Sequence, residues 1–293
     1  MILLLLSCNN SSKTETDNNS KTDTMNTATI EKKNKPINNI KGAAGHLYVD
    51  DGGNGGIPVL FVHSFGGSTQ HWAAQLEHLR TNRQAVAFDL RGHGQSDAPG
   101  NNDYNVESLT NDIAAVADSL KLKRFMLVGH SMGGSAAIAY AGKHPDRVAG
   151  LLLTGTPGKT PKEQAAPIIA SLESDKYEKV MEDYMKQLLA NAKPETEKLE
   201  REGMNKISKE ASLSIIKAAF QFDPLPSLRN YPGPKLIVSA SKDEQPGSLH
   251  QLLPEIPFKK VEGTSHWIQM DKPDEFNKIL DGFLEKVEKE NKK

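Results

Sequence analysis

The sequence predicts an α/β protein with a doubly wound, mostly parallel sheet and a helical insertion. Short, continuously apolar runs of strand length alternate with longer stretches of helical periodicity. Apolar strands of this kind are typical of a parallel sheet that is buried on both faces. The alternation is interrupted once, between residues 157 and 229, where the chain shows helical spacing only.

Each predicted strand is a short apolar run. The runs cover residues 46–49, 58–64, 85–90, 125–131, 150–155, 234–241 and 258–263. Before the fourth run, Ile113, Val116 and Leu120 fall on one face of an expected helix. Strands that alternate with such helices favour a doubly wound α/β sheet.

The interruption itself predicts helices. Apolar residues between positions 177 and 189 follow i, i+3, i+4, i+7 spacing, which is typical of an amphipathic helix. A second helix is expected from the N-cap Ser208 to Phe220. Because ligands bind beyond the carboxyl ends of the strands in open α/β sheets, we interpret residues 157–229 as a lid over a site. The alternative is a set of extra helices packed on the sheet edge.

Composition places the chain among ordinary globular proteins. Its 293 residues are enough for one large domain with an inserted subdomain, and 37% of them are hydrophobic and 25% charged. A formal net charge of −1 gives no reason to expect a nucleic-acid partner. The chain has one cysteine, so no internal disulfide can form. We expect neither a metal nor a cofactor, because no cluster of metal-ligand spacing and no dinucleotide fingerprint occurs in the sequence.

The pentapeptide Gly129-His130-Ser131-Met132-Gly133 is the first candidate for chemistry. An apolar strand precedes it and a helix rich in small residues follows it. A serine in a G-x-S-x-G turn between strand and helix has its oxygen exposed, and the glycines relieve crowding. The backbone N–H of Met132 would then begin the helix and point at a developing oxyanion.

At this point the chain resembles the α/β-hydrolase superfamily, whose nucleophile elbow often reads GHSMGG. Residues 63–67, His-Ser-Phe-Gly-Gly, resemble the family's His-Gly-X-Gly-Gly oxyanion loop. That resemblance implies that the Phe65 N–H is the second oxyanion donor, with Ser64 in place of the usual glycine. The segment from Asp89 to Ser96 resembles the family's D-x-R-G-x-G-x-S turn, in which we interpret Asp89 and Arg91 as structural.

The same resemblance implies a base and an acid in the order serine, acid, histidine. His266 follows the last predicted strand and precedes a C-terminal helix, as in the family's G-x-x-H-x-x-x-x-x-x-P-x-x-F ending. Asp243 follows the strand at 234–241, with Pro246 beyond it, and is preferred to the adjacent Glu244 as the acid. The acid would fix the imidazole tautomer and stabilise imidazolium.

These motifs imply a serine hydrolase that cleaves small-molecule carboxylic esters through an acyl-enzyme. Epoxide hydrolases and haloalkane dehalogenases of the fold use aspartate as the nucleophile, so Ser131 argues against both. Lactonase, thioesterase, carbon–carbon bond hydrolase and cofactor-free haloperoxidase stay open as alternatives. A non-catalytic ligand-binding protein of the same fold is the alternative from a different class.

The first residues predict an anchor. Residues 1–7 are mostly apolar, and Leu5-Leu6-Ser7-Cys8 resembles the lipobox of bacterial lipoproteins. That resemblance implies cleavage before Cys8 and a lipid on it, and hence an enzyme anchored to a membrane of the bacterial cell envelope. Residues 8–40 are polar and predict a disordered tether, followed by the core at 41–156 and 230–290. The alternative is a frayed apolar end on a cytoplasmic protein.

Overall fold

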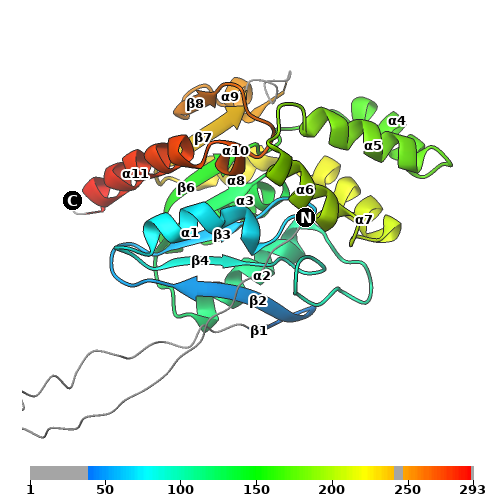
Figure 1. Cartoon of the computed structure of the whole chain (residues 1–293). Helices are drawn as coiled ribbons and strands as arrows, with labels where there is room; N and C mark the ends of the chain where they lie inside the picture. The colour runs from blue at the N-terminus through cyan, green and yellow to red at the C-terminus, as the bar shows by residue number, and fades with distance from the viewer. Residues whose placement is uncertain (1–38, 241–246, 292–293) are drawn as a thin grey trace, which may run out of the picture. The chain divides into compact units, whose positions relative to one another are not determined.

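The computed structural model describes residues 39–240 and 247–291 and contains an eight-stranded sheet. The strand order is β1-β2-β4-β3-β5-β6-β7-β8 (Figure 1). All neighbouring strands from β4 to β8 are parallel, whereas β2 is antiparallel to both β1 and β4. The strands are β1 (Asn39–Gly42), β2 (Gly45–Gly52), β3 (Val59–Val62), β4 (Ala85–Phe88), β5 (Phe125–His130), β6 (Val148–Thr154), β7 (Lys235–Ala240) and β8 (Phe258–Val261).

Helices cover both faces of this sheet, which confirms the predicted doubly wound class. Side chains of α1 and α11 pack on one face, and those of α2, α3 and α8 on the other. The helices are α1 (Ala73–Leu79), α2 (Val106–Ser119), α3 (Met132–Lys143), α4 (Lys162–Leu172), α5 (Tyr177–Leu188), α6 (Pro194–Met204), α7 (Lys209–Gln221), α8 (Pro224–Asn230), α9 (Leu249–Leu252), α10 (Ile268–Asp271) and α11 (Pro273–Glu290), with short 3-10 turns η1 (Thr69–Trp72) and η2 (Pro145–Arg147).

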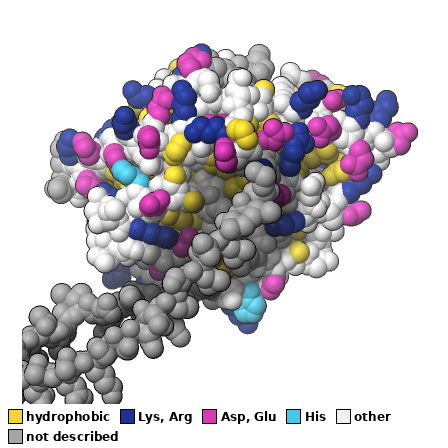
Figure 2. All heavy atoms as spheres, in the orientation of Figure 1, with side chains coloured by type: hydrophobic (Ala, Val, Ile, Leu, Met, Phe, Trp, Pro, Cys, Tyr) yellow, Lys and Arg dark blue, Asp and Glu magenta, His cyan; other side chains and the backbone are white. Residues whose placement is uncertain are grey.

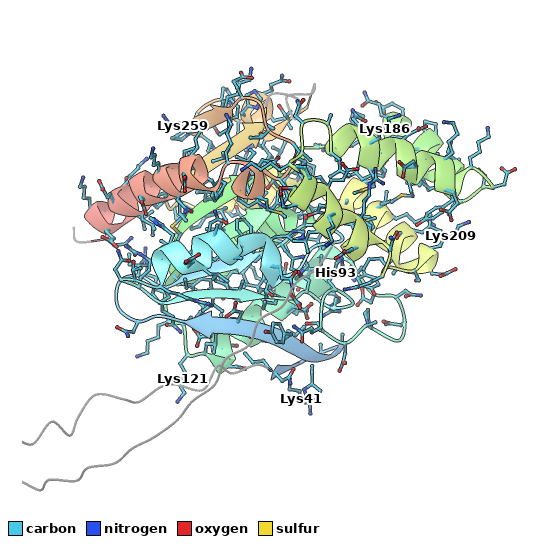
Figure 3. All side chains as sticks on the ribbon, viewed as in Figure 1. Lys41, His93, Lys121, Lys186, Lys209 and Lys259 are labelled. Atoms are coloured by element: carbon cyan, nitrogen blue, oxygen red, sulfur yellow. The ribbon has the colours of Figure 1, made fainter. Side chains whose placement is uncertain are left out.

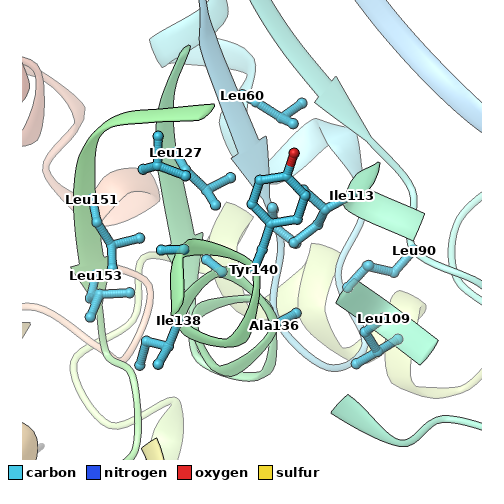
Figure 4. Close-up of a cluster of buried hydrophobic side chains, with 14 of the residues drawn as sticks. Leu60, Leu90, Leu109, Ile113, Leu127, Ala136, Ile138, Tyr140, Leu151 and Leu153 are labelled. Atoms are coloured by element: carbon cyan, nitrogen blue, oxygen red, sulfur yellow. The ribbon is translucent and has the colours of Figure 1, made fainter. Parts of the chain in front are cut away.

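Each central strand contributes to two cores, because successive side chains point to opposite faces of a sheet. In β3, Leu60 and Val62 join the core beneath α2 and α3, while Val59 and Phe61 join the core beneath α1 and α11. Figure 4 shows the first of these cores, with Tyr140 of α3 among leucines of the strands. Burial on both faces explains why these strands read as continuous apolar runs.

Every strand predicted from an apolar run is present, and β1 is an addition. The sequence does not predict β1, because Ile40 is its only buried residue. Ser208 caps α7 as expected, since its Oγ accepts a hydrogen bond of 3.1 Å from the Ala211 N–H. The sequence does not predict α4 and α6, whose apolar spacing is weak.

Five helices lie between β6 and β7 and form the expected helical insertion. The last of them, α8, packs on α3, where Ser227 lies against Gly142. We call the other four, α4 to α7, the cap. In Figure 1 the cap lies beside the carboxyl ends of the parallel strands.

Lysine and arginine side chains are interspersed with aspartate and glutamate over the face seen in Figure 2. Within residues 39–240 and 247–291, no helix has the length and apolar character needed to cross a bilayer. The predicted lipidation site Cys8, the predicted acid Asp243 and its neighbour Glu244 lie outside the described residues. The lipid anchor therefore stays a prediction.

Candidate active site

Ser131 lies at the turn between β5 and α3, in a backbone conformation that few non-glycine residues adopt. Its φ of 52° and ψ of −116° carry a strain of about 1–3 kcal/mol. Its N–H donates to the Thr154 carbonyl at 3.0 Å, and its own carbonyl accepts from the Ser135 N–H at 3.1 Å. The surrounding structure thus holds a half-buried serine at the carboxyl edge of the sheet in a strained turn, as a nucleophile elbow requires.

The two glycines of the pentapeptide allow α3 to approach the sheet closely. A Cβ added to Gly129 would lie 2.6 Å from the Gly134 Cα. A Cβ added to Gly133 would overlap the His63 carbonyl oxygen and lie 2.6 Å from the Val62 carbonyl oxygen. These contacts are with backbone, which cannot rotate away, so the G-x-S-x-G pattern reflects the packing of α3 on β3 and β5.

The predicted oxyanion loop, residues 63–67, follows β3 and is fixed by the buried His63. His63 Nε2 accepts a hydrogen bond from the Leu90 N–H at 2.9 Å, so the ring proton is on Nδ1. Nδ1 in turn donates to the Ser64 carbonyl at 2.7 Å. Burial lowers the pKa of His63 well below its ordinary value. A neutral histidine of defined tautomer therefore ties the oxyanion loop to the turn after β4.

The predicted oxyanion donors are the backbone N–H groups of Phe65 and Met132. Within the described residues, neither the Phe65 N–H nor the Met132 N–H donates to a backbone or side-chain acceptor. Met132 is the first residue of α3, where the first N–H groups have no intrahelical partner. Both groups are thus available to bind an oxyanion.

Ser64, the departure from the family's glycine, makes a specific contact. The Trp267 indole N–H donates to Ser64 Oγ at 3.2 Å, and both side chains are buried. Trp267 follows His266 directly in the chain. This hydrogen bond joins the oxyanion loop to the segment of the predicted base, a link that the family's usual glycine could not make.

His266 is buried at the carboxyl edge of the sheet, where several backbone contacts hold it. Its N–H donates to the Leu188 carbonyl at the end of α5 at 3.1 Å, and its carbonyl accepts from His130 Nε2 at 3.1 Å. Gly155, with φ of 52°, lies beneath the ring, where an added Cβ would be 2.8 Å from Cε1 of His266. Because Ser131 bonds to Thr154 and His266 lies on Gly155, the end of β6 brings the predicted nucleophile and base to one place.

A cavity of about 250 Å³ adjoins His266 beneath the cap. It is lined by the chain after β6, by α5, and by two residues that follow the undescribed segment. The described lining residues are Gly155, Thr156, Pro157, Gly158, Lys159, Thr160, Gln164, Tyr184, Gln187, Leu188, Gly247, Ser248 and His266. The predicted base thus borders a cavity that residues of α5 also line.

The turn after β4 has the structural role expected for it. Asp89 accepts hydrogen bonds from the Thr69 N–H at 2.6 Å and the Gln95 N–H at 2.8 Å. Arg91 donates to both carboxylate oxygens of Asp112, at 2.8 and 2.7 Å. These bonds hold the turn against η1 and α2.

Buried histidines surround the site. Burial lowers the pKa of His130 well below its ordinary value and lowers the pKa of His93 to about 4 (His93 is labelled in Figure 3). Together with His63 they are neutral at physiological pH. Among the described residues, no group of three or more His, Cys, Asp or Glu side chains could hold a metal ion.

The depressed histidine pKa values predict sensitivity to acid. The unfolded chain takes up a proton on each histidine near pH 6.5, whereas the folded protein does not. For each such histidine, the free energy of unfolding therefore falls by about 1.4 kcal/mol per pH unit, from pH 6.5 down to the pKa in the folded protein. For His93, whose pKa is about 4, the loss between pH 6.5 and 5 is about 2 kcal/mol. Urea unfolding between pH 5 and 7.5 measures this slope.

The variant His93→Phe isolates one of these groups. Its unfolding free energy is expected to fall less steeply with acid than that of the wild type, by about 1.4 kcal/mol per pH unit. Parallel slopes in His93→Phe and wild type would contradict the assignment.

Sequence reasoning missed two functional candidates, His71 and Glu200, which form a buried pair between η1 and α6. A single sequence carries no signal for this pair. Glu200 lies in a helix of charged residues that the apolar pattern does not predict, and 129 positions separate it from His71.

Comparison with known proteins agrees with this geometry. Residues 57–197 match the family model of the alpha/beta hydrolase fold. A putative 2-succinyl-6-hydroxy-2,4-cyclohexadiene-1-carboxylate synthase of Bacillus subtilis is 28% identical over 264 residues, a match that covers 83% of this chain and 95% of the relative. The dihydrolipoyllysine-residue acetyltransferase component of the acetoin cleaving system of Pseudomonas putida is 28% identical over 244 residues. That match covers 80% of this chain but 65% of the relative, which is less than two thirds.

Among solved structures, a thermophilic esterase from Thermogutta terrifontis superimposes with a TM-score of 0.72 at 26% identity. The match covers 85% of this chain and 98% of the esterase. The sheet order, the strained serine turn after β5 and these similarities lead to one assignment: the chain belongs to the α/β-hydrolase superfamily.

Proposed function

We propose that this protein is a serine hydrolase that cleaves carboxylic esters, with Ser131 as nucleophile and His266 as base. One observation carries the proposal. Ser131 has a strained backbone at the start of α3, and the N–H groups of Met132 and Phe65 have no acceptor among the described residues. Strain is retained where function needs it, and two free N–H donors suit a developing oxyanion.

In the proposed first step, Ser131 Oγ attacks the ester carbonyl carbon while His266 takes the hydroxyl proton. The carbonyl oxygen becomes an oxyanion and accepts hydrogen bonds from the Phe65 and Met132 N–H groups, each worth about 10²–10³ in rate. The intermediate then expels the alcohol, which takes the proton from His266 and leaves an acyl-enzyme.

In the second step, His266 removes a proton from water, which attacks the acyl carbon. Collapse of that intermediate returns the proton to Ser131 Oγ and releases the carboxylic acid. Asp243 is proposed to hold the imidazole in the correct tautomer and to stabilise imidazolium. Described residues flank its segment on both sides, and Gly247 lines the cavity that His266 adjoins.

Apolar side chains of the cap pack against two residues of the proposed site. The cap packs the cluster Leu172, Tyr177 and Met181 against Phe65, and Met185 and Leu189 pack against Trp267. Phe65 carries one of the proposed oxyanion donors, and Trp267 directly follows the proposed base His266. Methionine side chains adapt to different apolar shapes, so these clusters could yield to a hydrocarbon acyl or alcohol group.

A series of p-nitrophenyl esters from acetate to palmitate tests this proposal. We expect kcat/KM to rise with chain length over the first members, by up to about fourfold per methylene, because each buried methylene contributes about 0.8 kcal/mol. The rise should stop when the chain exceeds the cavity of about 250 Å³. Release of p-nitrophenol gives the rates, and a fluorophosphonate probe labels the nucleophile.

Parallel assays with a lactone and a thioester of matched acyl length separate the neighbouring activities of the fold. Hydrolysis of the lactone alone would assign a lactonase and replace the ester proposal. No turnover of any substrate, together with no labelling of Ser131, would contradict the serine hydrolase itself and leave a ligand-binding protein.

A further inference from the structure

The cap buries one carboxylate next to the oxyanion loop. Glu200 of α6 is fully buried, and its Oε1 lies 3.0 Å from Nε2 of His71, which is 1% exposed. Only Thr196 and Glu200 are buried on this helix, four residues apart on one face, whereas its other charged side chains face solvent or lie at the rim. A packing helix normally buries apolar residues at such positions, so packing does not account for Glu200.

The pair lies where the cap contacts the oxyanion loop. An added Cβ on Gly66 would be 2.5 Å from Met204 Sδ at the end of α6. The ring of His71 approaches the loop from the other side, 2.8 Å from the position of a Cβ on Gly67. Three residues of the loop are thus held by neighbouring segments. Gly66 lies against α6 and Gly67 lies against the ring of His71. Ser64 Oγ accepts the hydrogen bond from Trp267.

Removing the Glu200 carboxylate from water makes this arrangement costly in free energy. Burial raises the pKa of Glu200, while His71 of η1, His266 after β8 and the Trp267 side chain lower it by smaller amounts. A buried ionisable group adds little net stability even when it is paired. A fully buried carboxylate on an otherwise polar cap helix is therefore better explained by function than by stability.

We propose that Glu200 is a positioning residue for the ester hydrolysis proposed above. Through His71 it couples the docked cap helix α6 to the oxyanion loop, so that the Phe65 N–H is aligned only while α6 is in place. The inference rests on the proposed function, and it concerns the loop rather than the nucleophile. It connects closure of the cap over a substrate with completion of the oxyanion site.

The variant Glu200→Gln keeps the shape of the side chain and removes its charge. We expect kcat for the best p-nitrophenyl ester to fall about 10- to 100-fold, less than the loss of a whole oxyanion donor, while KM changes less than twofold. Tm should stay within about 3 °C of the wild type, because glutamine fills the same space as glutamate and its side-chain oxygen can still accept a hydrogen bond from the His71 ring. In a plot of kcat against pH, the ionisation of Glu200 should be missing from the acidic side of the variant's profile.

Glu195→Gln, an exposed glutamate in the first turn of α6, is the matched control and should behave as the wild type. His71→Gln replaces the other partner of the same contact and should lower kcat by a similar factor. The double variant should lose no more than either single one, since both act through one contact. If Glu200→Gln does not fold, His71→Gln alone decides the question by the same kcat and Tm criteria.

The following outcomes would overturn the inference that Glu200 positions the oxyanion loop. Wild-type kcat in folded Glu200→Gln, or a fall in Tm with kcat unchanged, would assign the pair a structural role while leaving the hydrolase proposal intact. Additive losses in the double variant would separate Glu200 from His71. A wild-type protein that neither hydrolyses esters nor reacts with the fluorophosphonate probe would overturn both proposals together.

Discussion

Replacing Ser131 with alanine is expected to lower kcat by at least about 10⁴-fold for any ester that the wild-type protein hydrolyses. In the proposed mechanism this side chain supplies the oxygen that bonds to the acyl group, so its loss leaves only substrate binding and the oxyanion donors. KM should change little, because the hydroxyl contributes little to ground-state binding. Release of p-nitrophenol measures the rate, and thermal unfolding verifies that the variant is folded.

Ser131→Gly makes this test more specific. It should be as inactive as Ser131→Ala but more stable by about 1 kcal/mol, because a φ of 52° penalises any side chain with a Cβ. Urea unfolding of the two variants measures the difference. Equal stabilities would contradict backbone strain at the elbow, and near wild-type hydrolysis by either variant would contradict the proposed nucleophile.

Replacing Gly133 with alanine is expected to destabilise the protein by about 3 kcal/mol and to abolish ester hydrolysis. The new methyl group would overlap the His63 carbonyl oxygen, and its other near neighbours belong to the backbone of Val62. Relief requires α3 to move away from β3, and this movement would separate the Met132 N–H from the oxyanion loop. Urea unfolding and the ester assay measure the two losses.

Gly282→Ala on α11 is the matched control for the added methyl group. An added Cβ there has nothing within 4 Å, and alanine favours a helix over glycine by about 1 kcal/mol. This variant should therefore be slightly more stable than the wild type and fully active. Wild-type stability of Gly133→Ala would show that α3 and β3 do not approach as closely as described here.

The sheet was predictable because its strands are buried on both faces. Such strands are apolar at most positions, so β3 to β7 can be recognised without any knowledge of their neighbours. The edge strand β1 could not be recognised, because one buried residue in four gives no pattern. Helices α5 and α7 have a continuous apolar face or a capping serine, whereas α6 buries only a threonine and a glutamate.

The candidate site, too, was predictable only where its residues lie in local sequence motifs. Ser131 and His266 each lie in a local motif whose spacing reflects a local geometry, a strand-to-helix turn in one case and the loop after β8 in the other. Asp243 stays a prediction from such a motif. The hydrogen bond from Trp267 to Ser64 joins positions 203 residues apart, and no motif in either segment predicts it.

By itself the sequence determined the doubly wound sheet, the helical insertion and the strand ends on which chemistry was to be expected. Those features follow from local periodicity and from short motifs, whose physical causes lie within a few residues of each other. Only the tertiary structure decided that Gly155 supports His266, that Ser64 bonds to Trp267, and that the cap directs Glu200 toward His71. Such contacts depend on how distant segments pack, and a buried polar pair has no periodicity by which a sequence could reveal it.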